Sequence, residues 1–275
     1  MVPVKYSTFC KRVALSKQTK LTCTSLFGNP IVLDVWPTLK YSPVLTHFGH
    51  SPLILNAYTT NQRIWEPQAS AVASRHSLSD LPTTVDTQPD TNQTTRTLLP
   101  GVLALHIRRG DFENHCDHMA TWSAYYNGWN DFPELPDQFV PPPGAGWGEN
   151  TPENRAIYKT HCFPNIEEIV KKVMDVKADY HLRTNRELKR VYIMTNGKNP
   201  WLQELTDELK GANPGGWDLI ASSRDLKLSW EQKFVSQALD MYVGTRAEVF
   251  VGNGVRFSLC RIKSHFRHFR SSFRH

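Results

Sequence analysis

The segment best suited to chemistry is residues 106–112, which reads HIRRGDF and directly follows an apolar run. In an extended strand alternate residues share a face, so His106 and Arg108 point together while Ile107 points into the core. A guanidinium can grip a phosphate through two hydrogen bonds, and an imidazole beside it can donate another. These residues therefore suit an anionic leaving group, and a solvated charged loop is the equally open alternative.

The residues that follow would shape the same loop. Gly110 lets the main chain turn sharply, and Asp111 would brace Arg109 through an ion pair. Two further glycine-containing turns, Asn196-Gly197 and Gly252-Asn253-Gly254, follow apolar runs and could hold phosphate oxygens on main-chain N–H groups. Taken singly, each of these turns is better explained by ordinary turn chemistry.

Strands and helices alternate around these polar segments. The predicted strands are residues 98–107, 190–195, 217–222 and 248–251, and the predicted helices are residues 163–182, 200–210 and 229–246. Asn199 is expected to cap the second helix, and Phe234 to lie on the buried side of the third. The alternation predicts an α/β fold with a doubly wound, Rossmann-like parallel sheet. Ligands bind at the carboxyl ends of such strands, where the polar segments lie.

The remaining residues suggest a domain division. Residues 1–69 mix short apolar pieces with prolines, which predicts short strands and loops, interpreted as the remnant of an N-terminal domain. Residues 70–97 are rich in Ser, Thr, Asp and Pro and predict a flexible linker. Residues 98–254 are interpreted as a single Rossmann-like, ligand-binding domain. Within it, residues 115–153 are interpreted as an irregular lid or acceptor loop.

The charge is unevenly distributed. The net charge of +6 comes from residues 256–275, where six of the 32 basic residues lie, which leaves 26 basic against 26 acidic residues before them. We interpret residues 255–275 as a basic tail that is translated intron, a misread stretch of the gene. A tail that binds nucleic acid or an acidic membrane is the weaker alternative, so no nucleic-acid partner is expected.

Several classes of protein and site are disfavoured. The five cysteines show no CxxC spacing, so no structural zinc site is expected, and no metal is predicted. Cys116 and Cys162 could pair in an oxidising compartment, and two ordinary thiols are equally open. The sequence lacks the GxGxxG and GxxxxGK[ST] motifs. It has no apolar run near the roughly 20 residues of a membrane span and no visible signal peptide.

Three segments in order resemble the fungal branch of the GDP-fucose protein O-fucosyltransferases: HIRRGDF, VYIMTNG and ALDMYVGTRAEVFVGNG, over roughly residues 98–254. The resemblance implies a GT-B-type fold of two Rossmann-like domains and a role in fucose and carbohydrate metabolism. It also implies inverting, metal-independent transfer of fucose from GDP-fucose to a Ser or Thr of a protein or glycan acceptor. The resemblance implies no cofactor besides this donor. It also implies a location in the ER or Golgi.

The resemblance also implies roles for individual residues. Arg108 would be the catalytic residue, stabilising the β-phosphate as the fucosyl bond breaks, and His106 would support the same diphosphate. Asp240 would lie near guanine and ribose, although a solvated helix acid is the better explanation without the resemblance. The other residues expected to bind the substrate are Arg109, Asp111, Asn196, Asn253 and Gly254.

Two departures from the family pattern predict an impaired enzyme. Val255-Arg256-Phe257 stands where the family has a Ser/Thr-rich phosphate-binding segment. The Gly-Asn-Gln-type segment that opens the family's first domain is not found, so the N-terminal domain is expected to be incomplete, and no catalytic base is named. A non-catalytic, GDP-sugar-binding remnant of such an enzyme is therefore the alternative function.

Overall fold

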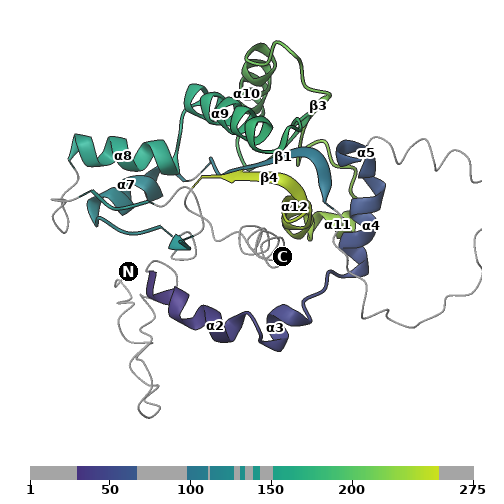
Figure 1. Cartoon of the computed structure of the whole chain (residues 1–275), viewed down its shortest axis with the longest axis horizontal. Coiled ribbons are helices and arrows are strands. Elements are labelled where there is room, and N and C mark those ends of the chain that lie inside the picture. Colours follow the sequence, from purple (N-terminus) through teal and green to yellow (C-terminus); the bar gives the residue numbers. More distant parts are fainter. Residues whose placement is uncertain are drawn as a thin grey trace, which may run out of the picture.

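The computed structural model describes residues 30–66, 98–110, 112–126, 131–133, 139–142 and 151–253. Its centre is a four-stranded parallel sheet in the order β3-β2-β1-β4 (Figure 1). The strands are β1 (Leu99–Ile107), β2 (Arg190–Thr195), β3 (Leu219–Ser222) and β4 (Ala247–Gly252). All four were predicted from the sequence, so the α/β class and the parallel sheet are confirmed.

One face of the sheet is covered by α9 (Ile166–Thr184) and α10 (Asn199–Gly211) (Figure 1). Alternate residues of β1 point to this face and are buried, among them Leu103, Leu105 and Ile107. They pack against Ile169, Val173, Leu205 and Leu209 of the two helices. Each fully buried aliphatic side chain contributes about 1.5–3 kcal/mol relative to exposure, so this layer holds β1 firmly in place.

The other face is covered by α12 (Ser236–Gly244), α4 (Pro52–Thr60) and α5 (Gln62–Trp65). Leu239 and Val243 of α12 pack with Ile54, Ala57, Tyr58 and Trp65 against the remaining residues of β1. The N-terminal helices therefore share a core with the sheet.

The prediction of strands and loops before the linker was wrong for residues 30–66, which are helical. The helices before α4 are the 3-10 helix η2 (Pro30–Val35), α2 (Trp36–Leu39) and α3 (Pro43–Thr46). The prolines do not break this stretch, because Pro43 and Pro52 stand in the first turns of α3 and α4, where no N–H is needed. The buried residues of α4, Ile54, Ala57 and Tyr58, have helical spacing.

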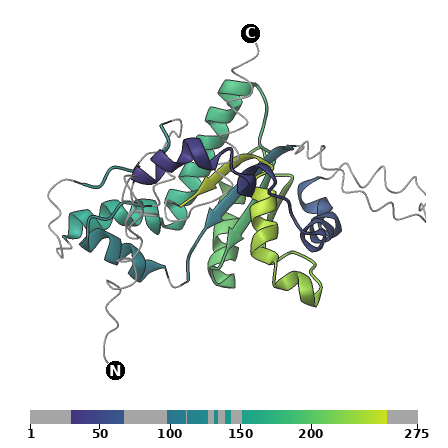
Figure 2. The ribbon, with the colours of Figure 1, turned by 90° about the horizontal axis from the view of Figure 1, so that it is seen from below.

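A third group of helices lies beside one end of the sheet in both views (Figures 1 and 2). It consists of α7 (Glu113–Thr121) and α8 (Pro152–Cys162), joined by the disulfide Cys116–Cys162 with a Cα–Cα distance of 5.9 Å. The alternative of two ordinary thiols is therefore wrong. The prediction of an irregular stretch over residues 115–153 was also wrong for the part of α7 that lies in it, because buried Cys116, Met119 and Ala120 give it a helical face.

Two predicted helix starts differ from the structure, and one predicted helix is divided into two. The helix expected from residue 163 begins at Ile166, because Asn165 and Glu168 form a capping box. Asn199 is the first residue of α10 and not its cap, which is Lys198.

The helix expected over residues 229–246 is divided into α11 (Trp230–Lys233) and α12, with Val235 outside the helical region. This break changes the direction of the side chains before it, and Phe234 is 74% exposed rather than buried.

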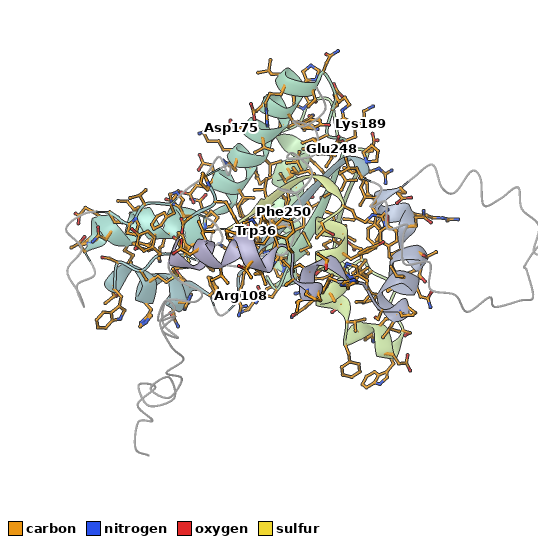
Figure 3. All side chains as sticks on the ribbon, turned by 60° about the horizontal axis from the view of Figure 1, so that its bottom comes forward. Trp36, Arg108, Asp175, Lys189, Glu248 and Phe250 are labelled. Carbon is orange, nitrogen blue, oxygen red and sulfur yellow. A yellow bond between two sulfur atoms is a disulfide. The ribbon has the colours of Figure 1, made fainter. Side chains whose placement is uncertain are left out.

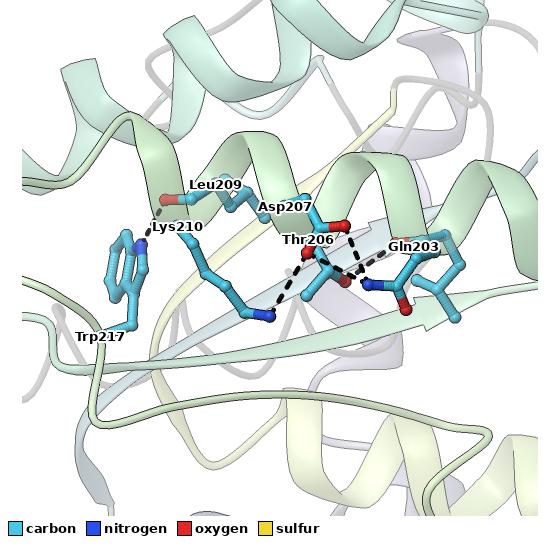
Figure 4. Close-up of polar contacts among 7 residues, drawn as sticks. Gln203, Thr206, Asp207, Leu209, Lys210 and Trp217 are labelled. Atoms are coloured by element: carbon cyan, nitrogen blue, oxygen red, sulfur yellow. Dashed lines mark hydrogen bonds and ion pairs between the residues drawn. The ribbon is translucent and has the colours of Figure 1, made fainter.

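The end of α10 is tied to the segment before β3. The Trp217 Nε1–H donates to the main-chain oxygen of Leu209 over 2.9 Å, while Gln203 and Lys210 contact Asp207 on the exposed side of the helix (Figure 4). The described part of the chain contains no helix with the length and apolar character of a membrane span.

Candidate functional site

The candidate site lies at the carboxyl edge of the sheet, between β1 and β4. The chain passes from β1 to β2 and β3 on one side and returns to β4 on the other side of β1. Such a switch point leaves a crevice in which ligands bind. His106 of β1 is paired with Gly252 of β4, so the segments that begin with Arg108 and Asn253 start side by side. The fold thus brings together residues that lie far apart in the sequence.

Asn253 fixes the main chain of Arg108. Its Oδ1 accepts from the Arg108 N–H at 3.3 Å, and its Nδ2 donates to the Arg108 carbonyl at 3.1 Å and to the Cys162 carbonyl at 2.8 Å. The Asn253 N–H also donates to the His106 carbonyl at 3.2 Å. The side-chain amide therefore connects the end of β4 to the loop after β1 and to the end of α8.

Asn196 holds the next residue in the same way. Its Oδ1 accepts from the Arg109 N–H at 2.7 Å. Gly110 has a φ of +56°, and a Cβ atom there would stand 2.8 Å from the Asn196 Nδ2. Only glycine fits both the left-handed backbone and the close approach. The turn after β1 and the turn after β2 are therefore joined by a hydrogen bond and by close packing.

The Arg109 guanidinium lies between two aromatic rings. Its Cζ is 3.8 Å from the ring centroid of Phe163 and 4.7 Å from that of Trp201, and its Nη1 donates to the Pro164 carbonyl at 2.7 Å. Burial lowers the pKa of this guanidinium from its ordinary value, and the nearby Glu113 opposes the shift. Sequence reasoning missed the two aromatic partners.

Arg108 has different surroundings. Its guanidinium lies 5.0 Å from the ring centroid of Phe112. Figure 3 shows Arg108 well apart from Lys189 and Glu248. His106 stands on the strand face of Val102 and Ala104, one register position from the carboxyl end of β1.

Asp240 of α12 is part of a hydrogen-bonded group on the β2 side of the site. It accepts from the Tyr192 hydroxyl at 2.7 Å and from the Ser223 hydroxyl at 2.9 Å. Burial raises the pKa of Asp240 to about 6, while the two hydroxyl donors oppose the shift. The alternative of a solvated helix acid is therefore wrong.

The model of the family described as GDP-fucose protein O-fucosyltransferase matches residues 65–258, which is most of the chain. The chain belongs to the GDP-fucose protein O-fucosyltransferase family. A search of curated proteins returned no match. Members of this family are glycosyltransferases of the fucosyltransferase class, and the family implies GDP-fucose as the donor and a protein as the acceptor.

Some expected features of this O-fucosyltransferase domain lie outside the described residues, namely Asp111, Gly254, the linker at residues 70–97 and the tail at residues 255–275. Within the described ranges, no group of three or more His, Cys, Asp or Glu side chains could hold a metal ion. The assignment to the fungal branch, the domain division and the incomplete N-terminal domain stay predictions.

A third arginine, which the sequence reasoning did not single out, lies at the same edge of the sheet. The Nη2 of Arg224, in the segment after β3, donates to the Gly197 carbonyl at 2.6 Å. The available signal was an arginine just beyond a predicted strand end, the same signal that singled out Arg108. The carboxyl edge of the sheet therefore carries arginines after both β1 and β3.

Proposed function

We propose that this domain binds GDP-fucose at the carboxyl edge of the sheet and transfers fucose to a Ser or Thr hydroxyl of a protein. Arg108 would contact the β-phosphate, and His106 would support the same diphosphate. The observation that carries the proposal is the anchoring of the Arg108 main chain by Asn253 at the switch point. Anchoring the main chain limits where the Arg108 guanidinium can lie, and a charged donor that is already in place needs no reorganisation during the reaction.

The chemistry explains why such a donor matters. The bond between the fucose anomeric carbon and the β-phosphate oxygen breaks as the acceptor oxygen attacks from the opposite face, which inverts the sugar, and the hydroxyl proton of the acceptor leaves to a base or to water. Negative charge then grows on the departing GDP, where a donor contributes more in the transition state than in the bound substrate. Removing one such donor typically lowers the rate by about 10²–10³.

The remaining proposed contacts follow the motif positions. Asp240 would lie near guanine and ribose, on the β2 side of the edge where its hydroxyl partners Tyr192 and Ser223 stand. Asn196 and Asn253 would support donor binding indirectly, because they hold the main chain of the loop after β1. Gly254 would hold phosphate oxygens on its N–H.

We propose for the whole protein a GT-B-type arrangement, metal-independent catalysis and a location in the ER or Golgi. The Cys116–Cys162 disulfide supports the location, because disulfides persist in oxidising compartments. The alternative function, a remnant that binds GDP-sugar without catalysis, is favoured by Val255-Arg256-Phe257 in place of a Ser/Thr-rich phosphate-binding segment.

Calorimetry with GDP-fucose on the parent chain and on Arg108→Ala tests the proposal. We expect binding to the parent and at least a tenfold loss in the variant, equivalent to about 1.4 kcal/mol. Arg183→Ala is the matched control, because Arg183 is an exposed arginine of α9 that pairs with Asp179. No binding to the parent would exclude both functions. If the parent binds, release of GDP in the presence of a folded acceptor separates the enzyme from the remnant.

A further inference from the structure

The two adjacent arginines of the β1 loop have different surroundings, and this difference carries an inference that rests on the proposed donor site. We propose that Arg109 is a positioning residue: its guanidinium fastens the α8–α9 junction and the start of α10 to the β1 loop, and thereby orients Arg108 toward the donor. We call Phe163, Pro164 and Trp201 the Arg109 clamp. This role replaces direct binding of the substrate by Arg109.

The clamp covers the guanidinium from several directions. The Phe163 ring lies 3.8 Å and the Trp201 ring 4.7 Å from Cζ, and the Pro164 carbonyl accepts from Nη1. A planar, weakly hydrated guanidinium suits such stacking, whereas a lysine ammonium would lose the flat contact. Because the two rings and the Pro164 carbonyl hold the Arg109 guanidinium, this group is directed into the protein.

The clamp connects three segments at the carboxyl edge. Phe163 and Pro164 lie between α8 and α9, while Trp201 lies in the first turn of α10. Trp201 packs so closely over Gly197 that a Cβ atom there would stand 2.6 Å from its ring. The fit of this indole therefore depends on the same turn that holds the Arg109 N–H.

The contacts continue from the clamp to Arg108. Cys162, which directly precedes Phe163, accepts from Asn253 Nδ2, and the same nitrogen donates to the Arg108 carbonyl. A shift of the α8–α9 junction would therefore move the main chain of Arg108. This gives Arg109 a route to the donor that needs no contact with it.

The test measures GDP affinity by calorimetry in variants that change either the charge or the rings. Arg109→Gln removes the charge, whereas Phe163→Leu and Trp201→Leu remove one ring each and leave both arginines in place. Phe163→Tyr keeps the ring and serves as the conservative rescue.

The control for general destabilisation is Trp217→Leu. Trp217 also lies beside a cation, with its ring centroid 4.8 Å from Lys177 Nζ, and it anchors the far end of α10 (Figure 4). This variant should lower the urea midpoint and keep the parent's GDP affinity.

For a positioning role, we expect each leucine variant of the clamp to weaken GDP binding about tenfold, while Phe163→Tyr binds like the parent. The double variant Arg109→Gln/Trp201→Leu should bind no more weakly than Arg109→Gln alone. Arg109→Gln should weaken GDP binding in the parent but add no further loss in the Arg108→Gln variant, because a positioning residue acts only through Arg108.

The opposite pattern overturns the proposal: leucine variants that bind GDP like the parent, and an Arg109→Gln change that weakens binding further in the Arg108→Gln variant. If the parent binds no GDP, the proposed function fails instead. The clamp is then judged from urea midpoints of the same single and double variants, where additive losses would contradict it.

Discussion

At the amino end of the sheet, the Glu248 side chain of β4 is only 6% exposed and is bound by Arg186 and by the main-chain N–H of Gly101. At the carboxyl end, two adjacent arginines follow β1, and asparagine side chains hold their main-chain groups. At the amino end the charge of Glu248 is thus neutralised within the chain. At the carboxyl end the polar contacts instead hold the main chain of a basic loop. This difference supports the proposal that the carboxyl edge binds the donor, whereas the amino edge has a structural role.

The largest effect on GDP binding should come from the glycine of the basic loop. Gly110 and Gly101 both have positive φ values, at opposite ends of β1, so Gly→Ala at either should cost about 1–2 kcal/mol of stability. Only at Gly110 would the new Cβ meet Asn196, at 2.8 Å. Gly110→Ala should therefore weaken GDP binding by more than tenfold, about 1.4 kcal/mol, in calorimetry. Gly101→Ala should bind normally, and equal losses in the two variants would remove the distinction between the edges.

The disulfide should matter for both stability and binding. Cys116 and Cys162 are 46 residues apart, so the Cys116→Ala/Cys162→Ala variant should lose about 2–4 kcal/mol in urea unfolding. GDP affinity should fall as well, because the Cys162 carbonyl holds Asn253. A reductant should bring the parent to the level of the double variant and change the variant little. Unchanged affinity after reduction would show that α7 and α8 do not support the site.

The smallest effect on GDP binding is expected at Asp240, whose effect should instead be a pH dependence of stability. Its pKa is raised from 3.8 to about 6 by burial, so the folded state binds this proton more tightly than the unfolded state. The associated stability is present below about pH 4 and is lost as the pH rises through 6, by about 3 kcal/mol at most. Asp240→Asn should remove that part of the fall between pH 4 and 7 in urea titrations. Parallel curves for parent and variant would show that Asp240 does not titrate in this range.

The sequence predicted the parts of the site that depend on local pattern. Apolar runs marked every strand, and a parallel sheet places all their carboxyl ends at one edge, so HIRRGDF and the two later turns had to meet there. The helices over residues 30–66 were missed because proline at the start of a helix looks, in sequence, like a break between strands.

What the sequence determined by itself was the α/β class, the four strands and the likeness to the O-fucosyltransferases that the family match bore out. The different surroundings of Arg108 and Arg109 were decided only by the tertiary structure. The two residues are neighbours with identical side chains, and no local pattern tells them apart. The partners that do so, Phe163, Trp201 and Asn253, are distant in the chain and reach the loop only because α8, α10 and β4 pack at one edge.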